Sequence, residues 1–249
     1  MGSYYWSLRV IMATSGSTNF STDRNTLIAG ALRLCGAISQ GETPSATLIS
    51  ESSEALNMLV KALQADGMPL WALKQYSVPL IAATASYRIG LSKTVNTPKP
   101  LKIIQAFLRE TSSGLDIPMT QLTKFDYNFL GNKTTQGNPI QYYYDVQSNY
   151  GDLYLFPVPS TTAASNYTVQ IVYQRPFEDF DASTDEPDFP QEWYDALKHL
   201  LADRLAPEHG LAIADRQDLA RRAKTLKEEA LGFGTEEGSI HWQADLRNW

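Results

Sequence analysis

Apolar residues recur with helical spacing near both ends of this 249-residue chain, whereas they alternate with polar residues between residues 76 and 175. A spacing of 3.6 residues places apolar side chains on one side of a helix, and a period of two places them on one face of a strand. Two helical hairpins separated by strands predict an α+β fold: an antiparallel helical bundle with an inserted, mainly antiparallel β domain and an extended C-terminal arm.

This pattern divides the chain into four expected parts. Residues 1–22 have the composition of a linker and predict a flexible N-terminal segment. Residues 23–75 and 176–234 are expected to form the helical bundle, and residues 76–175 the inserted β domain. Residues 235–249 are expected to form a C-terminal docking arm.

The first helical hairpin has identifiable helix starts. Thr22 or Asp23 is expected to cap the first helix, because short polar side chains accept hydrogen bonds from the first free amides. Thr43 is expected to cap the second helix, with Pro44 at its first position. The stripes expected to be buried are Leu27, Ile28, Ala31, Leu34, Cys35 and Ile38, and then Leu48, Ile49, Leu56, Leu59, Val60 and Leu63.

The central part of the chain is predicted to contain six strands. Pro79 indicates an edge position for the first of them, because proline cannot donate a ladder hydrogen bond. A short helix capped by Thr123 is expected between the third and fourth strands. The strands are expected at residues 76–81, 86–90, 101–110, 140–146, 152–158 and 167–174, with a hairpin loop at 147–151.

The stretch from Asp188 to Gly210 predicts a third main helix, with Asp188 as its cap and Pro190 in its first turn. Pro207 is expected to end or kink it. Trp193, Leu197, Leu200, Leu201 and Leu205 form its expected buried stripe. A fourth helix is expected to bury Leu219, Ala223, Leu226 and Ala230.

Asp195, His199 and Asp203 share one side of the third helix, at positions i, i+4 and i+8. Such a set can serve as a metal or proton-relay triad, but no aligned pair of histidines accompanies it. We therefore interpret it as a polar helix surface that faces solvent or another subunit. The basic residues of the fourth helix, Arg221 and Arg222 among them, alternate with acids and indicate a solvated or intersubunit surface.

The rest of the chemistry argues against a catalytic or metal-dependent protein. A net charge of −6 disfavours tight binding to nucleic acid, and a single cysteine excludes a cysteine-based zinc cluster. The segment from Asp179 resembles the first half of a calcium loop, but Thr184 replaces its glycine and Pro190 stands where a glutamate is needed. No nucleophile elbow, P-loop or dinucleotide-binding motif is present, so neither an enzymatic activity nor a cofactor is expected.

The order of these elements resembles the head-to-tail adaptor proteins of short-tailed bacteriophages, also called tail accessory factors or packaged-DNA stabilisation proteins. The resemblance extends from about Asn25 to Gly234. It is carried by residues 31–46, 56–76, 87–90, 137–145, 151–159 and 188–210.

The resemblance implies a virion protein, made in the host cytoplasm, at the junction of head and tail. It implies a ring of about twelve copies between a portal protein and a tail nozzle protein, through which DNA passes without sequence-specific binding and without contact with a membrane. Asp195, His199, Asp203, Arg221 and Arg222 are then candidate subunit-interface residues. The arm, which has apolar residues but no period, is the candidate portal-binding segment through Ile240, His241, Trp242, Leu246 and Trp249.

Two other functions remain open at this stage. A virion-associated hydrolase that cuts cell-wall peptidoglycan would use a pair of the 27 acidic residues, although no spacing selects a pair. A DNA-binding module would stack bases on the tyrosine-rich strands, although these strands have few basic neighbours.

Overall fold

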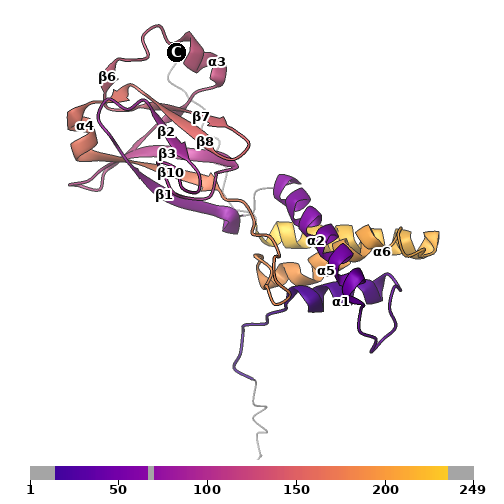
Figure 1. The fold of residues 1–249 in the computed structure, drawn as a ribbon. Coiled ribbons are helices and arrows are strands. Elements are labelled where there is room, and N and C mark those ends of the chain that lie inside the picture. The colour runs from indigo at the N-terminus through magenta and orange to yellow at the C-terminus, as the bar shows by residue number, and fades with distance from the viewer. Residues whose placement is uncertain (1–14, 67–69, 235–249) are drawn as a thin grey trace, which may run out of the picture.

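The computed structural model of the chain describes residues 15–66 and 70–234, and it shows a mixed α+β fold with antiparallel sheets (Figure 1). Four long helices gather at one end of the molecule and the strands gather at the other. Each group encloses its own hydrophobic cluster. Among the described residues, no helix combines the length and the apolar character that are needed to cross a bilayer.

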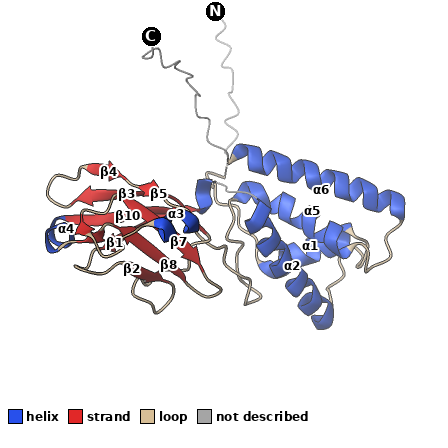
Figure 2. Ribbon diagram, turned by 90° about the horizontal axis from the view of Figure 1, so that it is seen from above, coloured by secondary structure: helices blue, strands red, loops and turns tan. Residues whose placement is uncertain are grey.

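The helical end consists of α1 (Arg24–Leu34), α2 (Ala46–Asp66), α5 (Tyr194–Leu205) and α6 (Ile213–Phe233). Helix α5 packs against the other three, with α6 on one side and α2 on the opposite side (Figure 2). This central position explains why α5 buries more of its surface than one stripe predicts. Its buried residues are Ala196, Leu197, His199, Leu201, Ala202 and Leu205.

The predicted helix starts are confirmed in part. The Asp23 carboxylate caps α1 by accepting a 2.7 Å hydrogen bond from the Thr26 amide. Helix α2 begins later than expected, so the prediction of Thr43 as its cap is wrong. The Ser45 hydroxyl accepts from the Leu48 amide instead. Leu34, expected in the core, is 39% exposed, because the buried side of α1 runs through Leu32.

Helix α5 also begins differently from the prediction. A short 3-10 helix, η2 (Gln191–Trp193), precedes α5, and no side chain caps the start of either helix. The prediction of Asp188 as a cap is wrong, because its carboxylate binds the Arg175 guanidinium and the Glu178 amide. An ion pair with a bidentate guanidinium is stronger than a cap hydrogen bond to a neutral amide. The expected end is confirmed: α5 stops at Leu205, two residues before Pro207.

The strands form two four-stranded sheets and one two-stranded pair. The pairs β5–β7 and β6–β9 are parallel and the other pairs are antiparallel. The first sheet has the order β1 (Leu73–Pro79), β10 (Tyr167–Gln174), β3 (Lys102–Glu110), β4 (Asp116–Pro118). The second has the order β2 (Ser86–Ile89), β8 (Gly151–Phe156), β7 (Gln141–Val146), β5 (Thr120–Gln121), and the pair consists of β6 (Gln136–Gly137) and β9 (Val158–Pro159).

All six predicted strands are present, and β1 lies at a sheet edge as Pro79 indicates. The hairpin between β7 and β8 is confirmed by the pairing of Val146 with Gly151. The predicted short helix is α3 (Lys124–Phe129), capped by Thr123. The sequence did not reveal β4, β5, β6, β9 or the helix α4 (Thr161–Asn166), because elements of two to six residues are too short to show a period.

Tyrosine serves both faces of the second sheet. Tyr142 is buried between the sheets with Leu153 and Leu155. Alternation along the strands places Tyr143 and Tyr154 on the other face, where their rings stack on each other and contact Tyr127. The second sheet therefore buries a mainly aliphatic core on one face and carries a cluster of tyrosine rings on the other.

Candidate functional site

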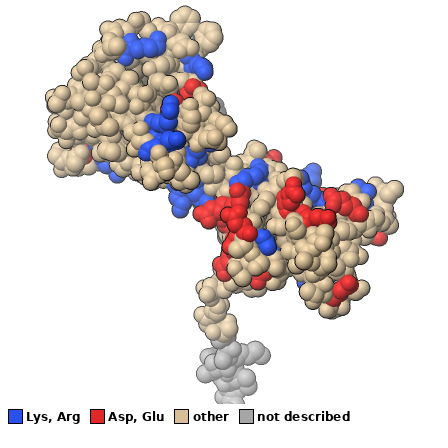
Figure 3. Space-filling model, in the orientation of Figure 1, with Lys and Arg blue, Asp and Glu red and all other residues tan. Residues whose placement is uncertain are grey.

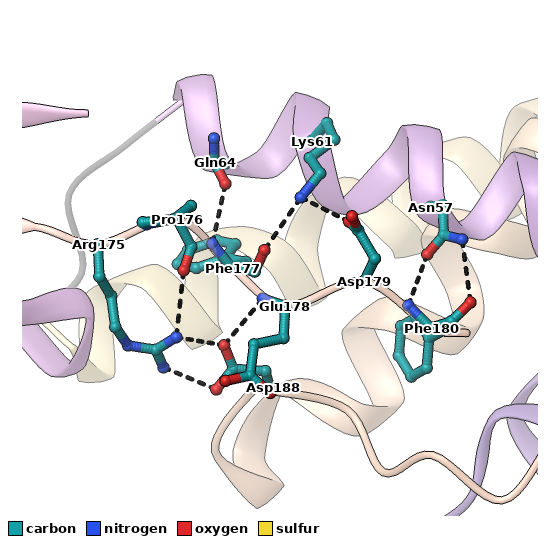
Figure 4. Close-up of polar contacts among 10 residues, drawn as sticks. All are labelled: Asn57, Lys61, Gln64, Arg175, Pro176, Phe177, Glu178, Asp179, Phe180 and Asp188. Carbon is teal, nitrogen blue, oxygen red and sulfur yellow. Dashed lines mark hydrogen bonds and ion pairs between the residues drawn. The ribbon is translucent and has the colours of Figure 1, made fainter. Parts of the chain in front are cut away.

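The two hydrophobic clusters are joined by the segment that follows β10, and polar contacts from several elements converge on this junction. Its first residue, Arg175, donates its amide to the Ala72 carbonyl oxygen, at 3.0 Å, beside the start of β1. Its guanidinium makes a bidentate contact with Asp188, in which one N–O distance is 2.6 Å. The ion pair closes the segment into a loop (Figure 4).

Helix α2 holds this segment through three polar side chains. Asn57, Lys61 and Gln64 lie at i, i+4 and i+7, so they project from one side of the helix. The Gln64 side-chain oxygen accepts from the Phe177 amide at 2.9 Å. The Asn57 amide group bonds both the amide and the carbonyl of Phe180, at 2.9 and 3.1 Å. These bonds satisfy backbone groups that have no helix or sheet partner.

Lys61 adds a charged contact to the same site. Its Nζ donates to the Phe177 carbonyl at 3.0 Å and lies 2.5 Å from an Asp179 carboxylate oxygen. Both side chains are nearly half exposed, so this pair positions the loop more than it stabilises it.

An aromatic cluster lies under the junction. Trp71 stacks on Phe177 with ring centroids 4.8 Å apart, and Phe189 contacts both Phe177 and Trp193. The Arg175 guanidinium lies 5.8 Å above the Trp71 ring. Hydrogen bonding to Asp188 raises the pKa of Arg175, against the effect of its partial burial. The charge of Arg175 is therefore fixed between a carboxylate and an indole ring.

The surface of the junction is a wide hollow of about 940 Å³ with mixed charge. Two of its carboxylates have partners within the chain. The Asp185 carboxylate accepts from the amides of Asp181 and Ala182, and Asp179 pairs with Lys61. In the described ranges, no group of three or more potential ligands is placed to hold a metal ion. The junction therefore links the two hydrophobic clusters through hydrogen bonds and ion pairs.

The structure places the predicted interface residues in different environments. His199 is only 6% exposed, so the expectation that it faces solvent or a neighbouring copy is wrong. The side chain is buried because α5 is covered on three sides by other helices. Its Nδ1 donates to the Asp195 carbonyl oxygen, one turn earlier in the same helix, at 2.8 Å. Asp195 is exposed and Asp203 is half-buried, and their interface role stays a prediction.

The two predicted arginines lie on the exposed side of α6. Arg221 pairs with Asp218 at 2.7 Å. Arg222 lowers the pKa of Asp195. Burial alone would raise the pKa of this carboxyl, but Lys198, His199 and Arg222 together hold it below the usual value. The bundle therefore brings Arg222 and Asp195 to the same side, between α5 and α6.

The predicted portal-binding residues lie outside the described residues, which end at Gly234. The junction residues were missed by sequence reasoning. A usable signal was the polar series Asn57, Lys61 and Gln64, which continues along α2 beside its apolar stripe. Its partners are more than 110 positions away, so the sequence alone did not show what this series binds.

The family model described as "SU10 adaptor protein" matches residues 23–240. No curated protein matches the sequence. The match confirms the expectation of a phage head–tail adaptor, whereas the restriction to short-tailed phages stays a prediction. Because the match covers most of the chain, this protein belongs to the SU10 adaptor protein family.

Proposed function

We propose that this chain is a structural head-to-tail adaptor that forms a closed ring of about twelve copies between the portal and the tail nozzle of a phage virion. Membership in the adaptor family is the observation that carries the proposal. It places the protein in the virion and implies association with other virion components such as portal and tail. It also favours a structural role over an enzymatic one. No observation favours the alternative of a peptidoglycan hydrolase.

The fold supports a division of labour within each copy. The helical end and the strand end are separate bodies in line with each other, joined by the Arg175–Asp188 junction (Figure 1). We assign the ring to the bundle, residues 23–75 and 176–234, and the tail-facing extension to the β domain, residues 76–175. The ring extends the DNA channel and helps to retain packaged DNA.

The charge of the bundle suits a channel for DNA. Residues 23–75 and 176–234 together contain nineteen acidic and eleven basic residues, a net charge of −8. A negative surface repels the phosphate backbone, so DNA slides past it without binding. Acidic bundle residues that line the channel would therefore favour passage of DNA during ejection.

We assign portal docking to the arm, residues 235–249. It contains Ile240, Trp242, Leu246 and Trp249 next to His241. Each large apolar side chain gains about 1.5–3 kcal/mol when it is buried, which favours an arm that docks on a partner. Tryptophan is also the residue type most often found to dominate the energy of an interface.

Sedimentation with purified portal protein of the same phage tests this function. The full chain should sediment with the portal, and a chain that ends at Gly234 should keep its melting temperature but lose this association. Trp242→Ala and Trp249→Ala should weaken it, whereas Phe20→Ala, at an exposed position on the bundle, serves as the matched control. A full chain that never associates with portal would contradict the proposal. A truncation that lowers the melting temperature strongly while portal binding persists would contradict the role of the arm.

A further inference from the structure

Opposite sides of the helical bundle differ in charge. The half of α6 from Ile213 to Lys224 contains four basic and two acidic residues. The opposite side is formed by α2, which contains Glu51 and Glu54 in its first half, and by residues 178–188, which contain six acids and no base. Helix α5 separates these sides (Figure 2), and acidic side chains form several patches on the face of the bundle that Figure 3 shows.

Several charged side chains on these two sides form no ion pair, although Arg222 also acts on the Asp195 carboxylate. Among the described residues, Glu51, Glu54 and Asp181 form no ion pair, and on α6 neither Arg216 nor Arg222 forms one. The C-terminal ends of α2 and α6 are connected by Lys227 and Asp66. The unpaired charges therefore lie on the N-terminal halves, where the two helices are far apart.

The acidic side also has a suitable shape. It contains a shallow hollow of about 650 Å³ lined by Glu54, Asn57, Met58, Lys61, Asp179, Asp181 and Arg204. Met58, one of its lining residues, is 49% exposed. Two basic residues also line the hollow: Lys61 pairs with Asp179, and Arg204 lies 3.5 Å from the Met58 sulfur, so the carboxylates without an ion pair are those of Glu54 and Asp181. Free carboxylates around an exposed thioether suit the aliphatic stem and charged end of an arginine.

These charges determine which surfaces can meet. Two acidic sides repel each other, as do two basic sides, so a two-fold dimer through either surface is disfavoured. The acidic side of one copy matches the α6 side of the next, and such a contact repeats head to tail. If the rotation between copies closes, the repeat is a ring.

We propose that a second copy of this chain covers the α2 side, with Arg221 and Arg222 of its α6 lying against Glu51, Glu54 and Asp181 around Met58. This inference rests on the proposed ring and names the surfaces that form it. Aromatic or long apolar side chains are few on either side, so the contact is mainly electrostatic. It should weaken as salt is raised, because exposed charge pairs are screened.

Disulfide crosslinking of the full chain tests the pairing. The native Cys35 is 1% exposed and does not interfere. The double variant Glu54→Cys/Arg221→Cys should form a ladder of disulfide-linked multimers under mild oxidation, and an equal mixture of the two single variants should form only dimers. The matched control pairs Arg221→Cys with Thr111→Cys on the exposed strand region and should form no ladder. Absence of a ladder from the double variant, or ready dimers of either single variant, would overturn the proposal.

Charge exchange gives a second test that needs no cysteine. Glu51→Lys/Glu54→Lys and Arg221→Glu/Arg222→Glu should each lose assembly on the portal. An equal mixture should regain it, because each reversed surface then meets its complement on the other variant. Failure of the mixture, with both variants folded, would again overturn the pairing.

The outcomes separate this inference from the proposed function. If the wild-type chain assembles on portal but the double variant gives no ladder, the ring proposal survives and the pairing of these surfaces is wrong. If the ladder forms but the wild-type chain never binds portal, the contact between copies is right and the adaptor role fails.

Discussion

The helical region and the strand region of this protein differ in net charge and in aromatic composition. The strand region, residues 76–175, contains five acidic and eight basic residues, a net charge of +3, against −8 for the two helical segments. It also contains ten of the thirteen tyrosines, whereas no tryptophan lies within it. Figure 3 shows the same division, with acidic side chains concentrated on the bundle.

This difference gives the two regions different surfaces. The bundle presents mainly acidic side chains, while the strand region presents stacked aromatic rings. The regions share the junction formed by α2 and residues 175–188. If they are separate folding units, each should respond to changes in its own core alone.

The largest effect should come from a deletion within one core. Leu197→Ala in α5 and Leu153→Ala in β8 each remove a fully buried side chain and should cost about 2–5 kcal/mol of unfolding free energy. Leu197→Ala should lower the urea midpoint of the unfolding transition that tryptophan fluorescence reports, because Trp71 and Trp193 lie in the helical cluster. Leu153→Ala should lower the urea midpoint of the transition that the circular dichroism of the tyrosines reports.

The comparison between the two regions depends on the selectivity of these effects. If either substitution shifts both signals by the same amount in urea, the molecule unfolds as one unit and the division is wrong. Leu91→Ala provides a control in the strand region, because its side chain is 68% exposed and its loss should leave both transitions unchanged.

A smaller effect is expected from the junction. Arg175→Ala leaves the partly buried Asp188 without its bidentate partner and should cost about 1.5–3 kcal/mol, as for a hydrogen bond to a charged group. It should also move the two urea transitions apart, because Arg175 connects both regions. Arg88→Ala is the matched control: it removes a similar pair with Asp152, but the Arg88 side chain is 49% exposed and the pair lies within the strand region, so the two transitions should not move apart. Equal effects of the two substitutions would show that the junction does not couple the regions.

Sequence patterns predicted the long elements well, because period and end signals agree along them. Residues 167–174 match β10 at both ends, and Asp23 caps α1 as expected. The start of α5 failed for a tertiary reason. Asp188 has the right residue type for a cap, but Arg175 from another segment binds it more strongly.

The candidate site was harder to predict than the fold. His199 has the spacing of an exposed polar residue, yet three neighbouring helices bury it, and no local pattern reports how many neighbours a helix has. In the sequence, Asn57 and Gln64 look like ordinary polar residues of an amphipathic helix. Their role appears only in the structure, where they bind residues 177 and 180 of the segment that returns to α2. The binding of the returning segment to α2 depends on contacts between positions that are distant in the sequence.

Two glycines offer a finer test of the comparison. A Cβ at Gly151 would overlap the Tyr144 ring, whose hydroxyl bonds the Pro100 carbonyl, so Gly151→Ala should cost about 1–3 kcal/mol in the strand region. A Cβ at Gly30 in α1 would meet only the flexible Lys198 side chain, at 3.1 Å. Gly30→Ala should therefore stabilise the bundle by up to about 1 kcal/mol through helix propensity. Urea midpoints of both variants measure this, and a destabilised Gly30→Ala would show that the contact between α1 and α5 is tighter than these distances indicate.

The smallest effect should appear at mildly alkaline pH and only in the strand region. Burial, together with the neighbouring Asp145 carboxylate, raises the pKa of Tyr143 to about 12, and burial also raises the pKa of Tyr87 and Tyr142. A tyrosine with a raised folded-state pKa contributes its full stability below the unfolded-state pKa of about 10 and loses it as the pH rises toward the folded-state value. At pH 10 only about half of the unfolded-state tyrosines have lost their proton, so the change between pH 8 and pH 10 is small. The tyrosine-reported urea midpoint should fall over this range. The tryptophan-reported midpoint should stay nearly constant, because Tyr194 is the only tyrosine of the described bundle.

The variant Tyr143→Phe tests the assignment to one residue. Phenylalanine has no proton to lose, so the decrease of the tyrosine-reported midpoint with pH should be smaller in this variant. An unchanged decrease would contradict the assignment to Tyr143.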